Sequence, residues 1–252
     1  MDKTLIIVIV IVLALLGIGT YYVFVTNSAS TVSQMENNSN NTQNQAKGTL
    51  YFTVTDAAAD MQNVTAVNAT IDKVEVFSNI QGWVTVSTTP KTFSLLELKA
   101  KSQAELLAKA DVDADTYSQV RLHVARILVT ESGEVKEAKM PSSELKINTR
   151  VMVNGNTDSV ARFDIMADKS MHKTGKGEFI FAPVIKFDSS SDATVNIDSN
   201  NVVNVTGGKI DASVNVGMNV DGEMKSDFML DSKLDIKINS GVIELNAGAM
   251  FK

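Results

Sequence analysis

The feature that most constrains the fold is an alternation of apolar and polar residues with a period of two, which begins at Gly48 and continues through most of the chain. In residues 49–55, for example, Leu50, Phe52 and Val54 alternate with Tyr51 and threonines. This period places alternate side chains on opposite faces of a β-strand. Comparable segments follow at residues 67–77, 83–86, 117–129, 144–153, 159–166 and 177–187. Short strands separated by turn residues predict a β-sandwich or barrel, and we expect an all-β sandwich.

Two segments depart from this alternation. In residues 117–129 the apolar set moves from Val120, Leu122 and Val124 to Ile127 and Val129, a change of phase that predicts a β-bulge or strand bend. Residues 93–110 are rich in leucine and alanine, and a serine at 102 precedes a glutamate at 105, which is the spacing of a capping box. We therefore expect one short helix over residues 102–109.

Residues 189–252 alternate even more regularly. Three apolar sets are separated by the turn signals Gly207-Gly208, Asp221-Gly222 and Asn239-Ser240-Gly241. The polar face of the strand near residues 228–238 carries Asp231, Lys233, Asp235 and Lys237. The pattern predicts an antiparallel β-meander with one dry and one wet face, which either extends the sandwich or forms a second sheet.

The N-terminal segment Leu5–Val25 is an uncharged stretch of 21 residues. A helix of about 20 apolar residues spans the hydrocarbon core of a bilayer. Lys3 precedes this stretch, and the next basic residue after it is Lys47, so the positive-inside rule places the N-terminus in the cytoplasm. We expect a single-pass transmembrane anchor and an extracellular C-terminal domain. The alternative is a signal peptide cleaved near Ser28-Ala29-Ser30.

The segment that follows is a polar linker. Of the 22 residues in 26–47, 16 are Ser, Thr, Asn or Gln, so little of it can be buried and we expect it to be disordered. As a flexible coil it spans about 25 Å. The predicted organisation is an anchor at 1–25, a linker at 26–47, a β-sandwich domain at 48–188 and the meander at 189–252. Five Asn-x-Ser/Thr sequons are candidate glycosylation sites, at Asn37, Asn40, Asn63, Asn68 and Asn204.

Composition excludes several classes of function. The formal net charge is -6, which argues against broad nucleic-acid binding. Cysteine is absent, which excludes disulfides, thiolate metal sites and cysteine nucleophiles. The two histidines, His123 and His172, are too few for a site built on several histidines. Neither a nucleophile elbow nor a phosphate-binding or dinucleotide fingerprint occurs.

Residues 48–187 resemble the domain of unknown function 4382 family. The matching segments appear in order as GTLYFTVTDA, ATIDKVEVF, Gly-Trp at 82–83, LLEL, DADTYSQVRLHV, MPSSELKI and GKGEFIFAPVIKF. The resemblance implies an exported prokaryotic β-sandwich domain, often tethered to a membrane and similar in architecture to prealbumin-like modules. It implies no activity and no ligand set. The family tends to have Gly where this chain has Asp115, and a Gly there suggests a left-handed turn, which Asp also tolerates.

The acidic residues Asp111, Asp113 and Asp115 are the candidate metal site. Alternate carboxylates on a loop can converge on Ca²⁺. An EF-hand loop beginning at Asp111 needs Gly at its sixth and Glu at its twelfth position, where this chain has Thr116 and Leu122. The alternative is a solvated turn, and we expect no other cofactor.

The remaining chemical candidates have structural alternatives. Asp56, Asp72 and Asp164 are the acids considered for a catalytic carboxylate pair, although nothing in the sequence brings two of them together, and Asp56 suits an interaction with backbone N–H groups of a loop. We expect His123 on a partly exposed sheet face, and His172 exposed in a polar loop. For Trp83 we expect packing in the core.

Three functions are compatible with this sequence. We favour a non-enzymatic, membrane-anchored extracellular module for binding, adhesion or envelope structure, with a glycan or protein ligand outside the cell. The alternatives are an extracellular hydrolase or sugar-processing domain that uses Asp carboxylates, and a subunit that self-assembles through its C-terminal meander or an edge strand.

Overall fold

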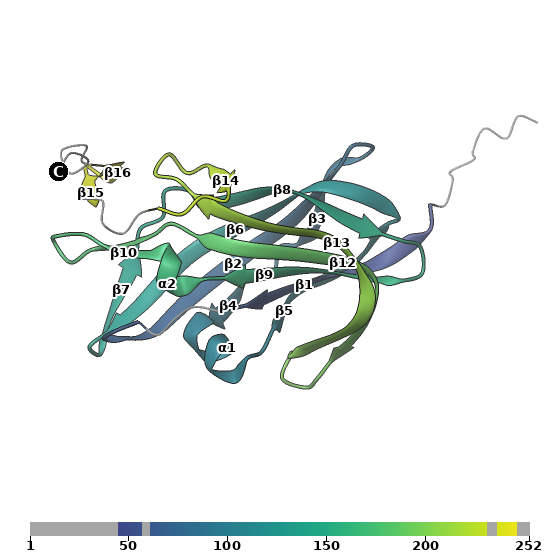
Figure 1. The fold of residues 1–252 in the computed structure, drawn as a ribbon, viewed down its shortest axis with the longest axis horizontal. Helices are drawn as coiled ribbons and strands as arrows, with labels where there is room; N and C mark the ends of the chain where they lie inside the picture. The colour runs from purple at the N-terminus through teal and green to yellow at the C-terminus, as the bar shows by residue number, and fades with distance from the viewer. Residues whose placement is uncertain (1–44, 57–60, 231–235, 246–252) are drawn as a thin grey trace, which may run out of the picture. The chain divides into compact units, whose positions relative to one another are not determined.

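The alternating segments after the linker fold into two large β-sheets, which we call sheet A and sheet B (Figure 1). The computed structural model describes residues 45–56, 61–230 and 236–245. Each large sheet has six strands, and two small two-stranded sheets and two short helices complete the described part of the chain.

Sheet A joins strands from both ends of the described chain. Its neighbours pair antiparallel, except that β1 and β9 are parallel. Its strands in spatial order are β14 (Met224–Ser226), β13 (Val203–Met218), β12 (Val184–Ile197), β9 (Asp158–Ile165), β1 (Lys47–Thr55) and β5 (Glu105–Asp113).

Sheet B is antiparallel and is built around two long central strands, β2 (Val64–Ser78) and β6 (Asp115–Glu131). The strands β3 (Gly82–Ser87) and β4 (Lys91–Ser94) both pair with β2. The strands β7 (Glu134–Ala138) and β8 (Glu144–Val153) both pair with β6.

The smaller elements lie beside these sheets. β10 (Met171–Lys173) pairs with β11 (Phe179–Phe181), and β15 (Ile236–Asn239) pairs with β16 (Val242–Leu245). The helices are α1 (Leu95–Lys101) and α2 (Ala167–Ser170).

The two large sheets share one hydrophobic core. Leu50 and Phe52 from sheet A and Val76 and Leu122 from sheet B belong to the same buried cluster. Within it, the ring of Phe163 lies between its neighbours, with centroids 5.9 Å from Phe52 and 5.2 Å from Phe187. The all-β prediction is therefore confirmed.

The predicted bulge in β6 is also present. Ile71 of β2 lies opposite Val124, but the preceding Thr70 lies opposite Arg126, so Ala125 is the extra residue. This one-residue insertion keeps both Val124 and Ile127 on the core side of β6, where they are 3% and 1% exposed.

The helix lies about two turns earlier in the chain than predicted, at Leu95–Lys101. The segment 102–109 is not helical: Ser102 ends α1 with a left-handed φ of 51°, and β5 begins at Glu105. Leu95 and Leu98 are spaced for one helical face and are buried, which explains the observed position. The capping-box spacing was misleading because the backbone of residues 105–113 pairs with β1 instead.

The predicted tail is partly a meander. β12 runs without interruption across residue 188, so β13 and β14 extend sheet A. The turn between β12 and β13 lies at 198–202, whereas Gly207 and Gly208 lie inside β13 and not in a turn. The other two turn signals are correct, with positive φ at Gly222 and at Ser240-Gly241. In β13, Val203, Val216 and Met218 are buried but Ile210 is 76% exposed, so the predicted dry face does not run along the whole strand.

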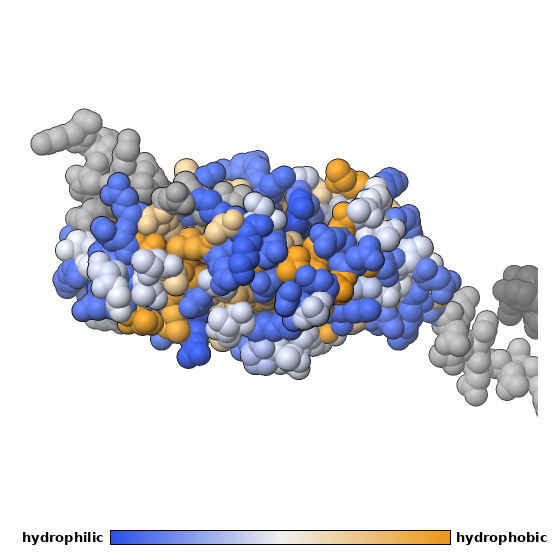
Figure 2. All heavy atoms as spheres, turned by 90° about the horizontal axis from the view of Figure 1, so that it is seen from below, coloured by the Kyte–Doolittle hydropathy of each residue, from blue (hydrophilic) through white to orange (hydrophobic). Residues whose placement is uncertain are grey.

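The predicted anchor and nearly all of the predicted linker lie outside the described residues, as does most of the segment that carries Asp231, Lys233 and Asp235. Among the residues that the structure describes, no helix is long and apolar enough to cross a membrane. Large apolar side chains at the surface are scattered, and Figure 2 shows them as small patches among hydrophilic residues on the side where α1 lies.

Candidate functional site

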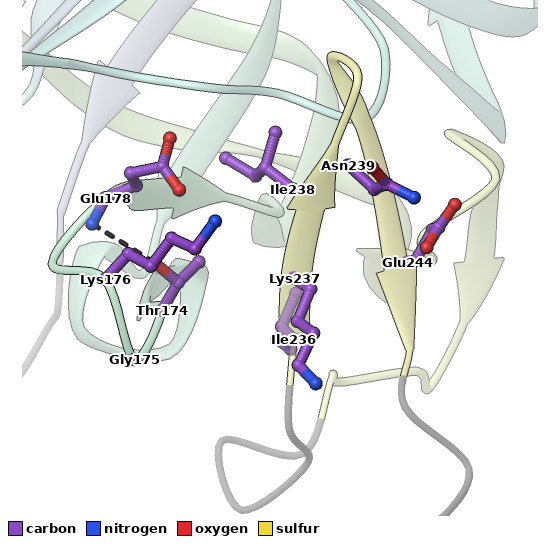
Figure 3. Close-up of a pocket in the computed structure, with 9 residues that line it drawn as sticks. All are labelled: Thr174, Gly175, Lys176, Glu178, Ile236, Lys237, Ile238, Asn239 and Glu244. Carbon is purple, nitrogen blue, oxygen red and sulfur yellow. Dashed lines mark hydrogen bonds between the residues drawn. The ribbon is translucent and has the colours of Figure 1, made fainter.

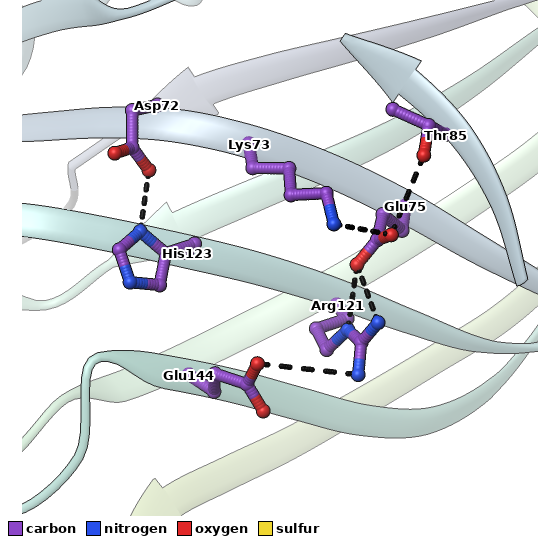
Figure 4. A network of polar contacts seen from close by, with 7 residues as sticks. All are labelled: Asp72, Lys73, Glu75, Thr85, Arg121, His123 and Glu144. Atoms are coloured by element: carbon purple, nitrogen blue, oxygen red, sulfur yellow. Dashed lines mark hydrogen bonds and ion pairs between the residues drawn. The ribbon is translucent and has the colours of Figure 1, made fainter. Parts of the chain in front are cut away.

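The outer face of sheet B, on the side away from the core, carries two neighbouring groups of polar contacts, one centred on Glu75 and the other a pair between Asp72 and His123 (Figure 4). Alternation along β2 and β6 sends Val76 and Leu122 into the core and their neighbours Glu75 and Arg121 outward. Register then brings the outward residues together, because Arg121 lies opposite Glu75 and His123 lies opposite Glu144 of β8. We call this set the sheet B network: Asp72, Lys73, Glu75, Thr85, Arg121, His123 and Glu144.

Glu75 is the centre of the network. It is 5% exposed, and its carboxylate accepts hydrogen bonds from Arg121 Nε at 2.7 Å and pairs with Arg121 Nη2 at 2.6 Å. Lys73 Nζ lies 2.7 Å from the same carboxylate, and Thr85 donates at 3.4 Å. Burial by itself raises the pKa of Glu75, but the hydrogen bonds from Lys73 and Arg121 outweigh it and hold the pKa below the ordinary 4.5.

Arg121 connects this carboxylate to an aromatic pair. Its guanidinium carbon lies 4.1 Å from the centroid of the Trp83 ring, which meets Phe77 edge-on at 5.3 Å. The expectation that Trp83 packs in the core was wrong. Trp83 pairs with Phe77 across β2 and β3, while the next pair along, Val76 and Val84, faces the core, so Trp83 lies half-buried on the outer face.

The second group of the network is the pair between Asp72 and His123, which lies beside the Glu75 group. Asp72 Oδ1 lies 2.5 Å from His123 Nδ1, and the His123 side chain is 39% exposed, as expected for a partly exposed sheet face. Register shifts around Ile71 and Lys73 mark an irregularity in β2 that turns two successive polar side chains outward.

The hollow above the network has a volume of about 340 Å³ and is lined only by polar residues, including Thr88. The pKa values of Glu75, Glu131, Asp188 and Glu223 are all lowered from their ordinary values. The arrangement therefore offers fixed hydrogen-bonding groups and a half-exposed aromatic surface.

The predicted calcium residues are not gathered into one group. Among the described residues, no cluster of three or more His, Asp or Glu side chains is placed to hold a metal ion. Asp111 accepts a hydrogen bond from Thr49 Oγ1 at 2.9 Å on sheet A. Asp115 accepts one from Ser78 Oγ at 2.5 Å and one from its neighbouring backbone amide, and the Asp113 carbonyl accepts one from Tyr117.

Asp115 also lacks the left-handed conformation that the family resemblance suggested. It is the first residue of β6 and pairs with Val153 of β8. The extended backbone of Asp115 is one that any residue adopts, so the Gly-to-Asp difference needs no compensation here.

Two of the acids considered for catalysis are neighbours in sheet A, because Asp164 of β9 lies opposite Thr55, the residue before Asp56. Asp56, at the end of β1, is 3% exposed and accepts a hydrogen bond from the backbone N–H of Ala167 at the start of α2, which fits the predicted interaction with backbone N–H groups. Asp72 is on the outer face of sheet B. Asp164 belongs to β9 of sheet A, where it lies opposite Lys186.

The five sequons differ in setting. Asn37 and Asn40 lie outside the described residues. Asn63 is exposed in the turn before β2 with a φ of 62°, and Asn204 is exposed in β13. Asn68 is half-buried within β2, which has strands on both sides of it. Use of these sites stays a prediction.

His172 was predicted to be exposed in a loop, and this was wrong. It belongs to β10, is 5% exposed, and neither of its ring nitrogens has a hydrogen-bond partner in the described chain. Burial lowers its pKa below the ordinary 6.5. The sequence signal for this burial is the apolar run 179–182 that pairs with β10, which the loop interpretation overlooked.

With two large sheets and a polar network on an outer face, the chain is an all-β module whose candidate site lies on the surface of a sheet. More narrowly, the chain belongs to the family described as Domain of unknown function (DUF4382), whose family model matches residues 47–183, more than half of the chain. No match was found among curated proteins or solved structures. The family resemblance seen in the sequence is thus confirmed.

Proposed function

We propose that the chain is a non-enzymatic, membrane-anchored extracellular module that binds a protein ligand through the outer face of sheet B. The observation that carries this proposal is the stacking of Arg121 on Trp83 while its guanidinium is held by the buried Glu75. Trp and Arg dominate the energetic centres of protein interfaces. Here both are fixed in place before a ligand arrives, which reduces the entropy lost on binding.

The surroundings of this centre support a macromolecular ligand. The hollow is polar and lies on an open sheet face, and exposed Lys146 of β8 lies opposite Arg121 at the rim. A polar rim around a well-packed centre is the usual anatomy of such interfaces. Because its pKa is lowered, Glu75 stays an ionised carboxylate. A hydrolase that uses a general acid needs instead a carboxyl group with a raised pKa.

The binding face is tested by site-specific photo-crosslinking on intact cells. A crosslinker replaces Lys146 on sheet B or, as a matched control, exposed Lys209 on sheet A. The partner protein captured by the crosslink is then identified and purified. Its affinity is measured for the wild-type chain and for the variants Lys146→Glu and Lys209→Glu. Crosslinks from position 146 and weaker binding only by Lys146→Glu are expected. Equal behaviour of the two positions contradicts the proposed face, and selective binding to a glycan array favours a glycan ligand instead.

The anchor is tested by adding protease to intact cells. We expect loss of the folded domain while a fragment that contains Met1 stays in the membrane. A mature chain that begins near residues 29–31 and is released into the medium would contradict the anchor.

A further inference from the structure

The small hairpin β10–β11 has two faces that belong to different hydrophobic clusters. Met171, Phe179 and Phe181 belong to the main core between the large sheets. Ile180 and the adjacent Ala182 belong to a second cluster with residues near the C-terminus. Since side chains alternate along a strand, the second face of the hairpin points away from the main core.

The second face is covered by what we call the C-terminal cover, residues 228–230 and 236–245. Its buried residues Leu230, Ile236 and Ile243 pack with Ile180 and Ala182, and Phe228 and Ile238 add partly buried contacts. Among the described strands, β15 and β16 pair only with each other. The hairpin of the cover is therefore held to the described remainder of the protein by side-chain packing and not by a continuous sheet.

His172 lies beneath this cover. It is directly opposite Ile180 in the β10–β11 ladder, and residues that are directly opposite project to the same face. The imidazole is 5% exposed, and both ring nitrogens lack a partner in the described chain. A buried polar side chain without a partner is rare and costs stability, so its presence at this interface calls for an explanation.

The edge of the cover is accessible to solvent. Figure 3 shows Thr174, Lys176 and Glu178 of the β10–β11 loop on one side and Ile236, Ile238 and Glu244 of the cover on the other. A hollow of about 270 Å³ lies between them and is lined by Thr174, two residues after His172. The hollow therefore lies beside the face of the hairpin that carries His172.

The charged groups around His172 do not bond to it. They belong to the β10–β11 hairpin, the neighbouring helix α2, the residue after β7 and the C-terminal segment. The described ones are Lys139, Asp168, Lys169, Lys173, Lys176, Glu178, Asp227, Lys237 and Glu244. None of them forms a hydrogen bond with either ring nitrogen. A proton added to the imidazole would therefore place an unpaired charge under an apolar cover.

We propose that His172 controls release of the C-terminal cover by pH: protonation of the buried imidazole detaches residues 228–230 and 236–245 from the β10–β11 hairpin while the two large sheets stay folded. The sign follows from burial, which lowers the pKa of His172 in the closed form below the 6.5 of the open form. The closed form is then fully favoured above pH 6.5. Below that pH, the ratio of open to closed molecules rises up to tenfold per pH unit until the closed form itself is protonated.

Hydrogen exchange tests this directly on the full chain in a mild detergent. Exchange of the β15–β16 amides is measured from pH 7.5 to pH 4.5, corrected for the intrinsic rate, and compared with that of β1. We compare wild type with His172→Phe, which cannot take up a proton, and with His123→Gln, the matched control at the only other histidine. Wild type and His123→Gln should lose protection in β15–β16 below pH 6.5, and His172→Phe should keep it.

Two results would overturn the proposal. One is the same acid-induced loss of protection in His172→Phe as in wild type, and the other is a simultaneous loss in β1, which means global unfolding. If His172→Phe does not fold, proton NMR of wild type still decides. Two imidazole signals are expected, and the one retained in His123→Gln must titrate below pH 6.5 together with the release. Titration at or above 6.5 with the cover still protected refutes the proposal.

Discussion

Replacing Arg121 with Met removes the guanidinium from the sheet B network but keeps a side chain of similar length. Arg121 supplies hydrogen bonds of 2.7 and 2.6 Å to a carboxylate that is 5% exposed. A hydrogen bond to a charged group contributes about 1.5–3 kcal/mol, and the contact with Trp83 adds about 0.5–1 kcal/mol. Because Lys73 still pairs with Glu75, we expect a net loss of about 2–4 kcal/mol in the free energy of unfolding.

The loss is measured by urea unfolding of the full chain in a mild detergent, followed by far-UV circular dichroism. Trp83 fluorescence is unsuitable because the substitution itself changes the surroundings of the ring. A loss of about 3 kcal/mol corresponds to a drop in Tm of about 6–12 °C for a domain of this size. A loss below about 0.5 kcal/mol at pH 7 would refute the reasoning.

Two further measurements separate the ion pair from simple packing. The double variant Glu75→Met with Arg121→Met should be more stable than the sum of the single losses predicts, by about 1–3 kcal/mol. The lowered pKa of Glu75 means that its stabilisation is present above pH 4.5 and is lost as the pH falls through the folded-state pKa. The difference between wild type and Arg121→Met should therefore shrink in acid. Strict additivity and a pH-independent difference would both contradict the proposed role of the pair.

Four other substitutions, one of them a control, test the fold by the same unfolding assay. Gly48→Ala should cost about 3 kcal/mol, because a Cβ there would lie 2.2 Å from the Asn154 carbonyl oxygen, whereas Gly175→Ala, with nothing within 4 Å, should be neutral; equal effects would contradict the close approach. Phe163→Ala should cost about 3–5 kcal/mol because two aromatic rings pack against it, and a loss under 1 kcal/mol would place the core elsewhere. Lys225→Met should leave the Tm unchanged, since its pair with Glu223 is exposed, and a clear shift would show that this pair matters.

Much of the fold follows from local alternation. The period of two identified the strands that became β1, β6 and β8, and the change of phase in β6 located its bulge. The helix was misplaced because residues 102–109 have the local preferences of a helix, while pairing of β5 with β1 is a contact across the fold. A single sequence carries no direct signal for such pairing.

The site was harder to predict than the fold. The sequence named Asp72, His123 and Trp83 separately, but only the register between β2, β3 and β6 brings them onto one face. Glu75 and Arg121 were not singled out, since each is an ordinary charged residue in an alternating strand. The burial of His172 depends on a cover more than 50 residues away in sequence, so the polar residues of its own loop were misleading.

The position of β1 within sheet A determines how the domain responds to mechanical load. The strand is second from the edge of the sheet and pairs with the edge strand β5 on one side and with β9 on the other. A pulling force that enters at Lys47 along the strand axis therefore loads both ladders in shear at the same moment, eight residue pairs with β5 and seven with β9. The hydrogen bonds share that force and do not open one after another, so the domain is built to resist tension applied at its N-terminal end.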